Sequence, residues 1–79
     1  MLSILNIVSK CIMTYSVQNN IVDLREKKGV TQEELAKAID VSRQTVIALE
    51  KGNYSPSLLL AFRISMFFER PIESIFKLN

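Results

Sequence analysis

The sequence contains no histidine and no tryptophan, and Cys11 is its one cysteine in 79 residues. Without histidine the commonest acid–base side chain is missing, and the usual zinc sites are excluded. A single cysteine excludes an intramolecular disulfide and fits a reducing, cytoplasmic setting. The two glycines, Gly29 and Gly52, stand apart, so there is no glycine-rich phosphate loop. We therefore expect no catalytic site, no cofactor and no metal.

The composition is that of an ordinary globular domain, with 48% hydrophobic and 23% charged residues. A length of 79 residues supports one domain with a modest core. The formal net charge of +2 permits nucleic-acid binding but does not argue for it. The apolar stretch at residues 1–16 is interrupted by Lys10 and is shorter than the roughly 20 apolar residues of a membrane span. We therefore expect no membrane segment.

The clearest pattern covers residues 31–52, TQEELAKAIDVSRQTVIALEKG, and predicts two short helices joined by a tight turn. Thr31 and Glu34 have the spacing of a capping box that starts the first helix, and Ser42 is an N-cap for the second. Asp40 lies at the turn, because aspartate tolerates the left-handed conformation better than most residues. The inward-facing positions at helical spacing are Leu35, Ala36, Ile39, Val46 and Leu49.

Two helices joined by a turn of three or four residues form a helix-turn-helix unit. Ala36 is expected where the helices cross, since a larger side chain there would hold them apart. The second helix, residues 43–50, leaves an exposed face that carries Arg43, Gln44, Ile47 and Ala48. Arginine and glutamine near a helix start are the residue types that hydrogen-bond guanine and adenine edges in the major groove.

The segment QEELAKAIDVSRQTVIALEKGNYSPSLLLAFRISMFF resembles the XRE-type helix-turn-helix regulators, relatives of lambda repressor and Cro, and the resemblance covers residues 21–76. It implies an all-α fold, a five-helix lambda-repressor-like DNA-binding domain, which we assign to residues 17–79. In this family the first helix packs behind the helix-turn-helix unit, which is called the reading unit below. The resemblance therefore also implies an internal ion pair between Arg25 and Glu50.

The function that the resemblance implies is sequence-specific binding of double-stranded DNA by a homodimeric transcriptional regulator. Such a protein is a repressor of bacterial or phage type that acts in the cytoplasm, on the nucleoid when bound, and reads a palindromic operator. The chain departs from the family at Asp40, where glycine is usual, and at residues 69–71, where a glycine-containing turn is common. Both are turn positions that accept the residues present.

Nine residues are candidates for DNA contact. On the recognition helix, at about residues 43–50, the base-contacting candidates are Ser42, Arg43, Gln44 and Ile47. The backbone-contacting candidates are Gln32, Thr45, Lys51, Asn53 and Tyr54. Three of these have structural alternatives: a spacer for Thr45, packing on the next helix for Tyr54, and capping of its own helix for Lys51.

Outside the reading unit, the pattern predicts helices over Val17–Lys28, Leu58–Phe68 and Pro71–Phe76, and no extended alternation requires a sheet. Ser57 is an N-cap for the segment Leu58–Phe68. This segment is apolar almost throughout, which indicates burial on more than one side. The last helix should fold back on the core through Ile72, Ile75 and Phe76. This apolar excess favours a homodimer.

Residues 1–16 form an extension whose role the sequence leaves open. Drawn as a helix, they carry an apolar face that could bind the core, a second subunit or another protein. Alternatively, Met13 is the natural start and the preceding residues come from an over-called upstream start. A partner-binding extension would suit an antitoxin-like or phage-type protein whose main role is to bind a protein partner. A pure interaction module without DNA binding is disfavoured, because packing does not require Gln32, Arg43 and Gln44.

Overall fold

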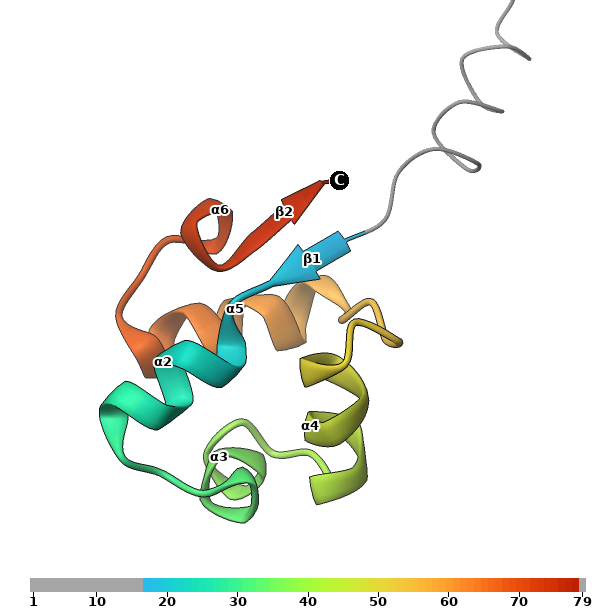
Figure 1. Cartoon of the computed structure of the whole chain (residues 1–79). Helices are drawn as coiled ribbons and strands as arrows, with labels where there is room; N and C mark the ends of the chain where they lie inside the picture. Colours follow the sequence, from blue (N-terminus) through green and yellow to red (C-terminus); the bar gives the residue numbers. More distant parts are fainter. Residues whose placement is uncertain (1–16, 79) are drawn as a thin grey trace, which may run out of the picture.

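The computed structural model describes residues 17–78 of the chain. This part folds into five helices and one short sheet (Figure 1). The elements are β1 (Val17–Asn19), α2 (Ile21–Lys28), α3 (Gln32–Ala38), α4 (Arg43–Glu50), α5 (Leu58–Phe68), α6 (Ile72–Ile75) and β2 (Phe76–Leu78). The expected all-α, five-helix architecture is confirmed. The extension at residues 1–16, with any sixth helix, lies outside the described residues.

The two ends of the described chain pair as a small antiparallel sheet, with Val17 opposite Leu78 and Asn19 opposite Phe76 (Figure 1). The expected absence of a sheet and the predicted helix start at Val17 are therefore wrong. The side chain of Asn19 accepts a hydrogen bond from the backbone N–H of Ile21, so the helix begins after it. The last helix likewise ends one residue early, because Phe76 already belongs to β2.

Side-chain caps start three of the helices as the sequence predicts. Thr31 and Glu34 form a complete capping box at α3, and Ser42 and Ser57 each accept a hydrogen bond from the third residue of α4 and of α5. The turn between α3 and α4 contains Asp40 with φ 61°, the left-handed conformation expected there. Local side-chain chemistry therefore fixes where the two helices of the reading unit begin.

One apolar core joins all five helices of residues 17–78. Its buried members are Ile21, Leu24, Leu35, Ala36, Ile39, Val46, Leu49, Leu60, Ile64 and Ile75. Ala36 is 3% exposed on α3, as expected of a small residue at a helix crossing. Phe76 packs against this core from β2, so the C-terminal segment does fold back as predicted. The core fixes α4 relative to the other helices.

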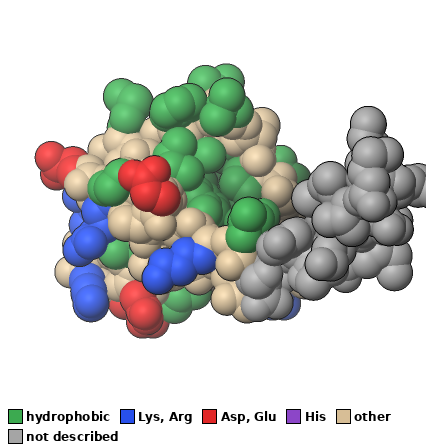
Figure 2. Space-filling view, turned by 90° about the horizontal axis from the view of Figure 1, so that it is seen from above, with side chains coloured by type: hydrophobic (Ala, Val, Ile, Leu, Met, Phe, Trp, Pro, Cys, Tyr) green, Lys and Arg blue, Asp and Glu red, His purple; other side chains and the backbone are tan. Residues whose placement is uncertain are grey.

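Helix α5 buries one face and exposes the other. Leu60, Ala61 and Ile64 are buried, whereas Leu58, Leu59, Phe62 and Met66 are exposed. Within residues 17–78, the prediction that this helix is buried on more than one side is therefore wrong. Seen from above, hydrophobic side chains gather along one edge of the molecule and reach toward its centre (Figure 2). None of the described helices is both long enough and apolar enough to cross a membrane.

Candidate nucleic-acid interface

The start of α4 is held by hydrogen bonds that leave its first residues exposed. The Ser42 hydroxyl oxygen accepts from the backbone N–H of Thr45 at 3.1 Å, and the two hydroxyl groups lie 3.0 Å apart. Arg43 and Gln44 are exposed directly after this cap, and Ile47 is half-buried one turn later. The structure therefore brings together three of the four base-contacting candidates on one outer surface, while the hydroxyl group of Ser42 is engaged at the helix start.

The end of α4 is anchored by Glu50, whose side chain is 6% exposed. Its Oε2 accepts from Arg25 Nε on α2 at 2.6 Å, which confirms the expected ion pair. Its Oε1 accepts from Gln32 Nε2 on α3 at 2.9 Å. Arg25 also donates to the carbonyl oxygen of Val30 at 3.1 Å. One carboxylate therefore ties the reading helix to both preceding helices.

Gln32 also faces the start of the reading helix. With its amide nitrogen given to Glu50, its carbonyl oxygen lies 3.5 Å from Arg43 Nη2, the outer limit of a hydrogen bond. The resulting network runs from Arg25 through Glu50 and Gln32 to Arg43. Sequence reasoning treats Gln32 only as a phosphate ligand, and the structure adds that it links the first turns of α3 and α4. Its second amide N–H remains chemically able to meet a phosphate.

The remaining backbone-contact candidates lie in and after the last turn of α4. Lys51, Asn53 and Tyr54 are exposed, Tyr54 to 44%. The backbone N–H of Lys51 donates to Ile47, so this residue is also the C-cap of its helix. These three side chains lie beyond the opposite end of α4 from Arg43 and Gln44.

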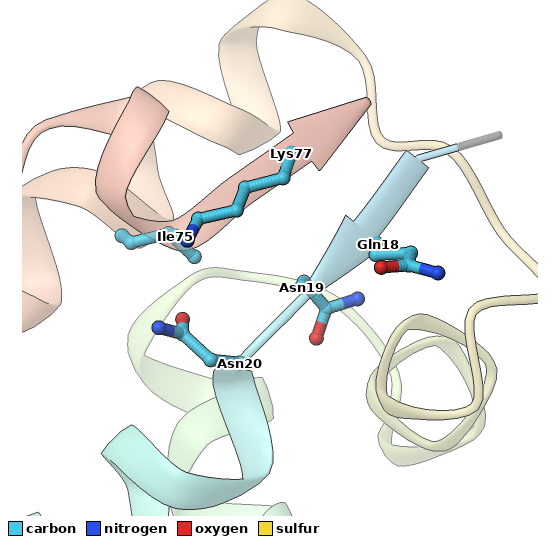
Figure 3. Close-up of a pocket in the computed structure, with 5 residues that line it drawn as sticks. All are labelled: Gln18, Asn19, Asn20, Ile75 and Lys77. Carbon is cyan, nitrogen blue, oxygen red and sulfur yellow. The ribbon is translucent and has the colours of Figure 1, made fainter. Parts of the chain in front are cut away.

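Asn19, which the sequence does not single out, anchors the last turn of α4. Asn19 Nδ2 donates to the carbonyl oxygen of Leu49 at 2.8 Å, and Asn20 Nδ2 donates to that of Ser74 at 3.1 Å. Both asparagines line a small pocket with Gln18, Ile75 and Lys77, at the junction of β1 with α2 and α6 (Figure 3). These amides connect helix ends and strands, which accounts for the polar lining. The only sequence signal for them is the tendency of asparagine to bond nearby backbone.

The first turn of α3 carries a carboxylate stabilised in its charged form. The backbone N–H of Thr31 donates to Glu34 Oε1 at 2.8 Å, and this hydrogen bond, assisted by the Thr31 side chain, lowers the pKa of Glu34 below its usual value. In the folded protein, where the capping box is formed, Glu34 is therefore ionised at neutral pH. Its charge also complements the positive end of the α3 dipole.

The geometry is that of a helix-turn-helix with an exposed second helix, and residues 21–75 match the family model described as helix-turn-helix. The chain belongs to the XRE-type helix-turn-helix regulators. This family is a DNA-binding class without enzymatic activity, so the regulator is not an enzyme. The regulator is 53% identical over 60 residues to an uncharacterized HTH-type transcriptional regulator of Methanocaldococcus jannaschii, which covers 76% of this chain and 91% of that protein.

Two further relatives span bacteria and a phage. The uncharacterized HTH-type transcriptional regulator YgzD of Bacillus subtilis is 45% identical over 63 residues, covering 80% of this chain and 96% of YgzD. The cryptic phage CTXphi transcriptional repressor RstR of Vibrio cholerae is 37% identical over 57 residues, covering 72% of this chain and 51% of RstR. The helix-turn-helix regulators similar to this chain therefore include one named as a repressor.

Proposed function

We propose that this regulator is a transcriptional repressor that binds a palindromic operator as a homodimer. The single observation that carries the proposal is the exposed start of α4, where Arg43 and Gln44 stand free of the core beside a capped helix end. A protein named as a repressor among its relatives supports the direction of regulation. The proposal places the protein in the cytoplasm, and on the nucleoid when it is bound to its operator.

In this proposal α4 enters the major groove with its first turn leading. Arg43 forks onto the O6 and N7 atoms of a guanine, and Gln44 pairs with the N6 and N7 atoms of an adenine. Ile47 offers an apolar contact to a thymine methyl group. Ser42 sits over the same base edges, although its hydroxyl group is already engaged with Thr45. The sequence preference therefore rests mainly on Arg43 and Gln44.

Contacts to the DNA backbone then come from both sides of the reading helix. Gln32, at the first turn of α3, is placed for a phosphate through its second amide N–H, while its carbonyl oxygen faces Arg43. Thr45 is half-buried on the same helix as the base-contacting residues. Beyond the far end of α4, the exposed side chains of Lys51, Asn53 and Tyr54 are the candidates for the other strand. Such contacts set the register of the protein on the duplex.

The test is a selection of bound sequences from random duplex DNA with the full-length protein. We expect an enriched inverted repeat whose half-sites are about 34–36 Å apart, one helical turn of the duplex. Weak, salt-sensitive binding without any enriched sequence would overturn the proposal and favour a role in binding a protein partner. A reporter gene with the enriched site placed over its promoter then tests repression, for which expression has to fall when the protein is supplied.

A further inference from the structure

The outer face of α5 is an apolar stripe. Leu58, Phe62 and Met66 follow one another four residues apart and are 71%, 51% and 76% exposed, and Leu59 beside them is 60% exposed. Residues at this spacing lie on one side of a helix. Because α5 has 11 residues, the stripe runs along most of a helix about 16 Å long. Within residues 17–78 each of these four side chains keeps more than half of its surface exposed.

The stripe carries no charge. Arg63 is the one charged residue of α5, and its Nη1 lies 4.0 Å from Asp40 Oδ2 at the turn between α3 and α4. Arg63 is therefore directed toward its own reading unit rather than toward the stripe. A surface of uncharged aliphatic, aromatic and thioether groups does not match a charged partner surface. It does match another apolar surface, such as the same stripe on a second copy of the chain.

We propose that this stripe is the homodimer interface, with α5 of one copy packed against α5 of a second copy across a two-fold axis. The inference rests on the proposed function, since it names the surface through which the homodimer forms. A two-fold contact places the same patch on both copies and therefore requires a self-complementary surface, which an uncharged apolar stripe provides. Phe62 lies midway between Leu58 and Met66, and a symmetric crossing brings this central position of each copy closest to the axis.

The inner side of α5 explains how such a dimer reaches the DNA-binding face. Leu60 and Ile64 belong to the same core as Val46 and Leu49 of α4. A contact that fixes α5 against its partner thereby fixes α4 through shared packing, because packed interiors transmit displacement rather than absorb it. The spacing of the two reading helices is then set by the α5 contact.

The area of the stripe predicts a dimer of modest strength. Four side chains with these exposures present on the order of 400 Å² per copy, the size at which an apolar patch on a monomer is commonly functional. Two such patches supply about half of the roughly 1,600 Å² that a standard interface buries. We therefore expect a reversible dimer whose formation is linked to operator binding.

The test uses full-length Phe62→Glu, with Ala38→Glu as the matched control because Ala38 is an exposed apolar residue on another helix, α3. Sedimentation velocity is run from about 1 μM to several hundred micromolar. We expect dimers for the wild type and the control, and self-association weakened by roughly tenfold or more for Phe62→Glu, since a charge there would be buried unpaired. Circular dichroism checks that the helices persist.

Charge pairing distinguishes interface loss from damage to the fold. An equimolar mixture of Phe62→Glu and Phe62→Lys is expected to dimerise where each variant alone does not, and added salt should weaken that mixed dimer. A wild type that stays monomeric at every concentration, or a dimer that Phe62→Glu leaves intact, overturns the interface. If either result is found but the wild-type protein still enriches an inverted repeat, the proposed DNA-binding function stands and only the α5 interface is rejected. The two proposals can therefore fail separately.

Discussion

Helices α4 and α5 share one core, yet their exposed faces are built differently. The exposed residues at the start of α4, Arg43 and Gln44, are polar. A network of hydrogen bonds from Arg25 through Glu50 and Gln32 reaches Arg43. The exposed residues along the outer face of α5 are apolar, so no network of side-chain hydrogen bonds holds them in place. A surface that recognises direction-dependent groups such as base edges gains from side chains whose orientation is set in advance.

An apolar stripe needs no such preparation, because the hydrophobic effect is non-directional. Its requirement is a complementary shape at a fixed place on the core. Under the two proposals, the contrast between these helices corresponds to a surface that reads DNA sequence and a surface that pairs two copies. Changes on α4 should alter which DNA is bound, and changes on α5 should alter the protein concentration at which binding occurs.

The largest effect is expected from Glu50→Ala, which removes the anchor of the α4 network. Arg25 is 15% exposed at its side chain and would be left with an unpaired charge, so the free energy of unfolding should fall by about 3 kcal/mol. Urea unfolding followed by circular dichroism, at one fixed protein concentration, measures the change. Glu50→Gln is the control, since its amide oxygen can still accept a hydrogen bond. A loss of less than about 1 kcal/mol in Glu50→Ala would show that the pair contributes no more than an exposed one.

Arg43→Ala should leave the fold intact and relax the sequence preference at one base position. Discrimination there is expected to fall by about 1–3 kcal/mol, the value of one bidentate contact, while binding to unrelated sequences changes little. Competition binding with operators that differ at single positions measures this. Sedimentation should still give the wild-type mass. An equal loss on every sequence would remove Arg43 from base reading and make it a phosphate contact.

Lys51→Ala should act on every sequence alike. If Lys51 contacts one phosphate, its removal lowers the slope of log affinity against log salt by about one and leaves the preferred operator unchanged. Fluorescence anisotropy across a salt series measures the slope, with Lys27→Ala as a control because Lys27 is an exposed lysine on another helix, α2. An unchanged slope would leave Lys51 as the C-cap residue only.

The sequence predicts those features of the fold that depend on residues close together in the chain. The caps at Thr31, Ser42 and Ser57 and the turn at Asp40 depend on residues within about four positions, and all four are confirmed. The sheet could not be foreseen in this way. Each strand has three residues, too few for a periodic signal, and its partner is at the other end of the described chain.

In the candidate site too, the features set by nearby residues could be predicted and those set by the folding of distant segments could not. Exposure of Arg43 and Gln44 follows from helical periodicity, and the structure agrees. The hydrogen bond from Gln32 to Glu50 joins two residues that are 18 positions apart in the sequence, and only folding brings their side chains together. The α5 face could not be assigned either, because an apolar pattern does not say whether the surface that buries it belongs to the same chain.

The smallest effect is expected at Glu34, which lies outside both surfaces and starts α3. Because its pKa is lowered in the folded protein by the backbone N–H of Thr31, ionised Glu34 contributes stability above its unfolded pKa of about 4.5. That contribution is lost as the pH falls through the lower, folded pKa. Glu34→Gln should therefore be less stable than the wild type at pH 7, and the difference should shrink steadily in acid. Thermal unfolding of both proteins between pH 7 and pH 3 measures it. A difference that stays constant over this range would mean that the carboxylate charge adds nothing to the capping box, and that α3 depends on the Thr31 hydroxyl group alone.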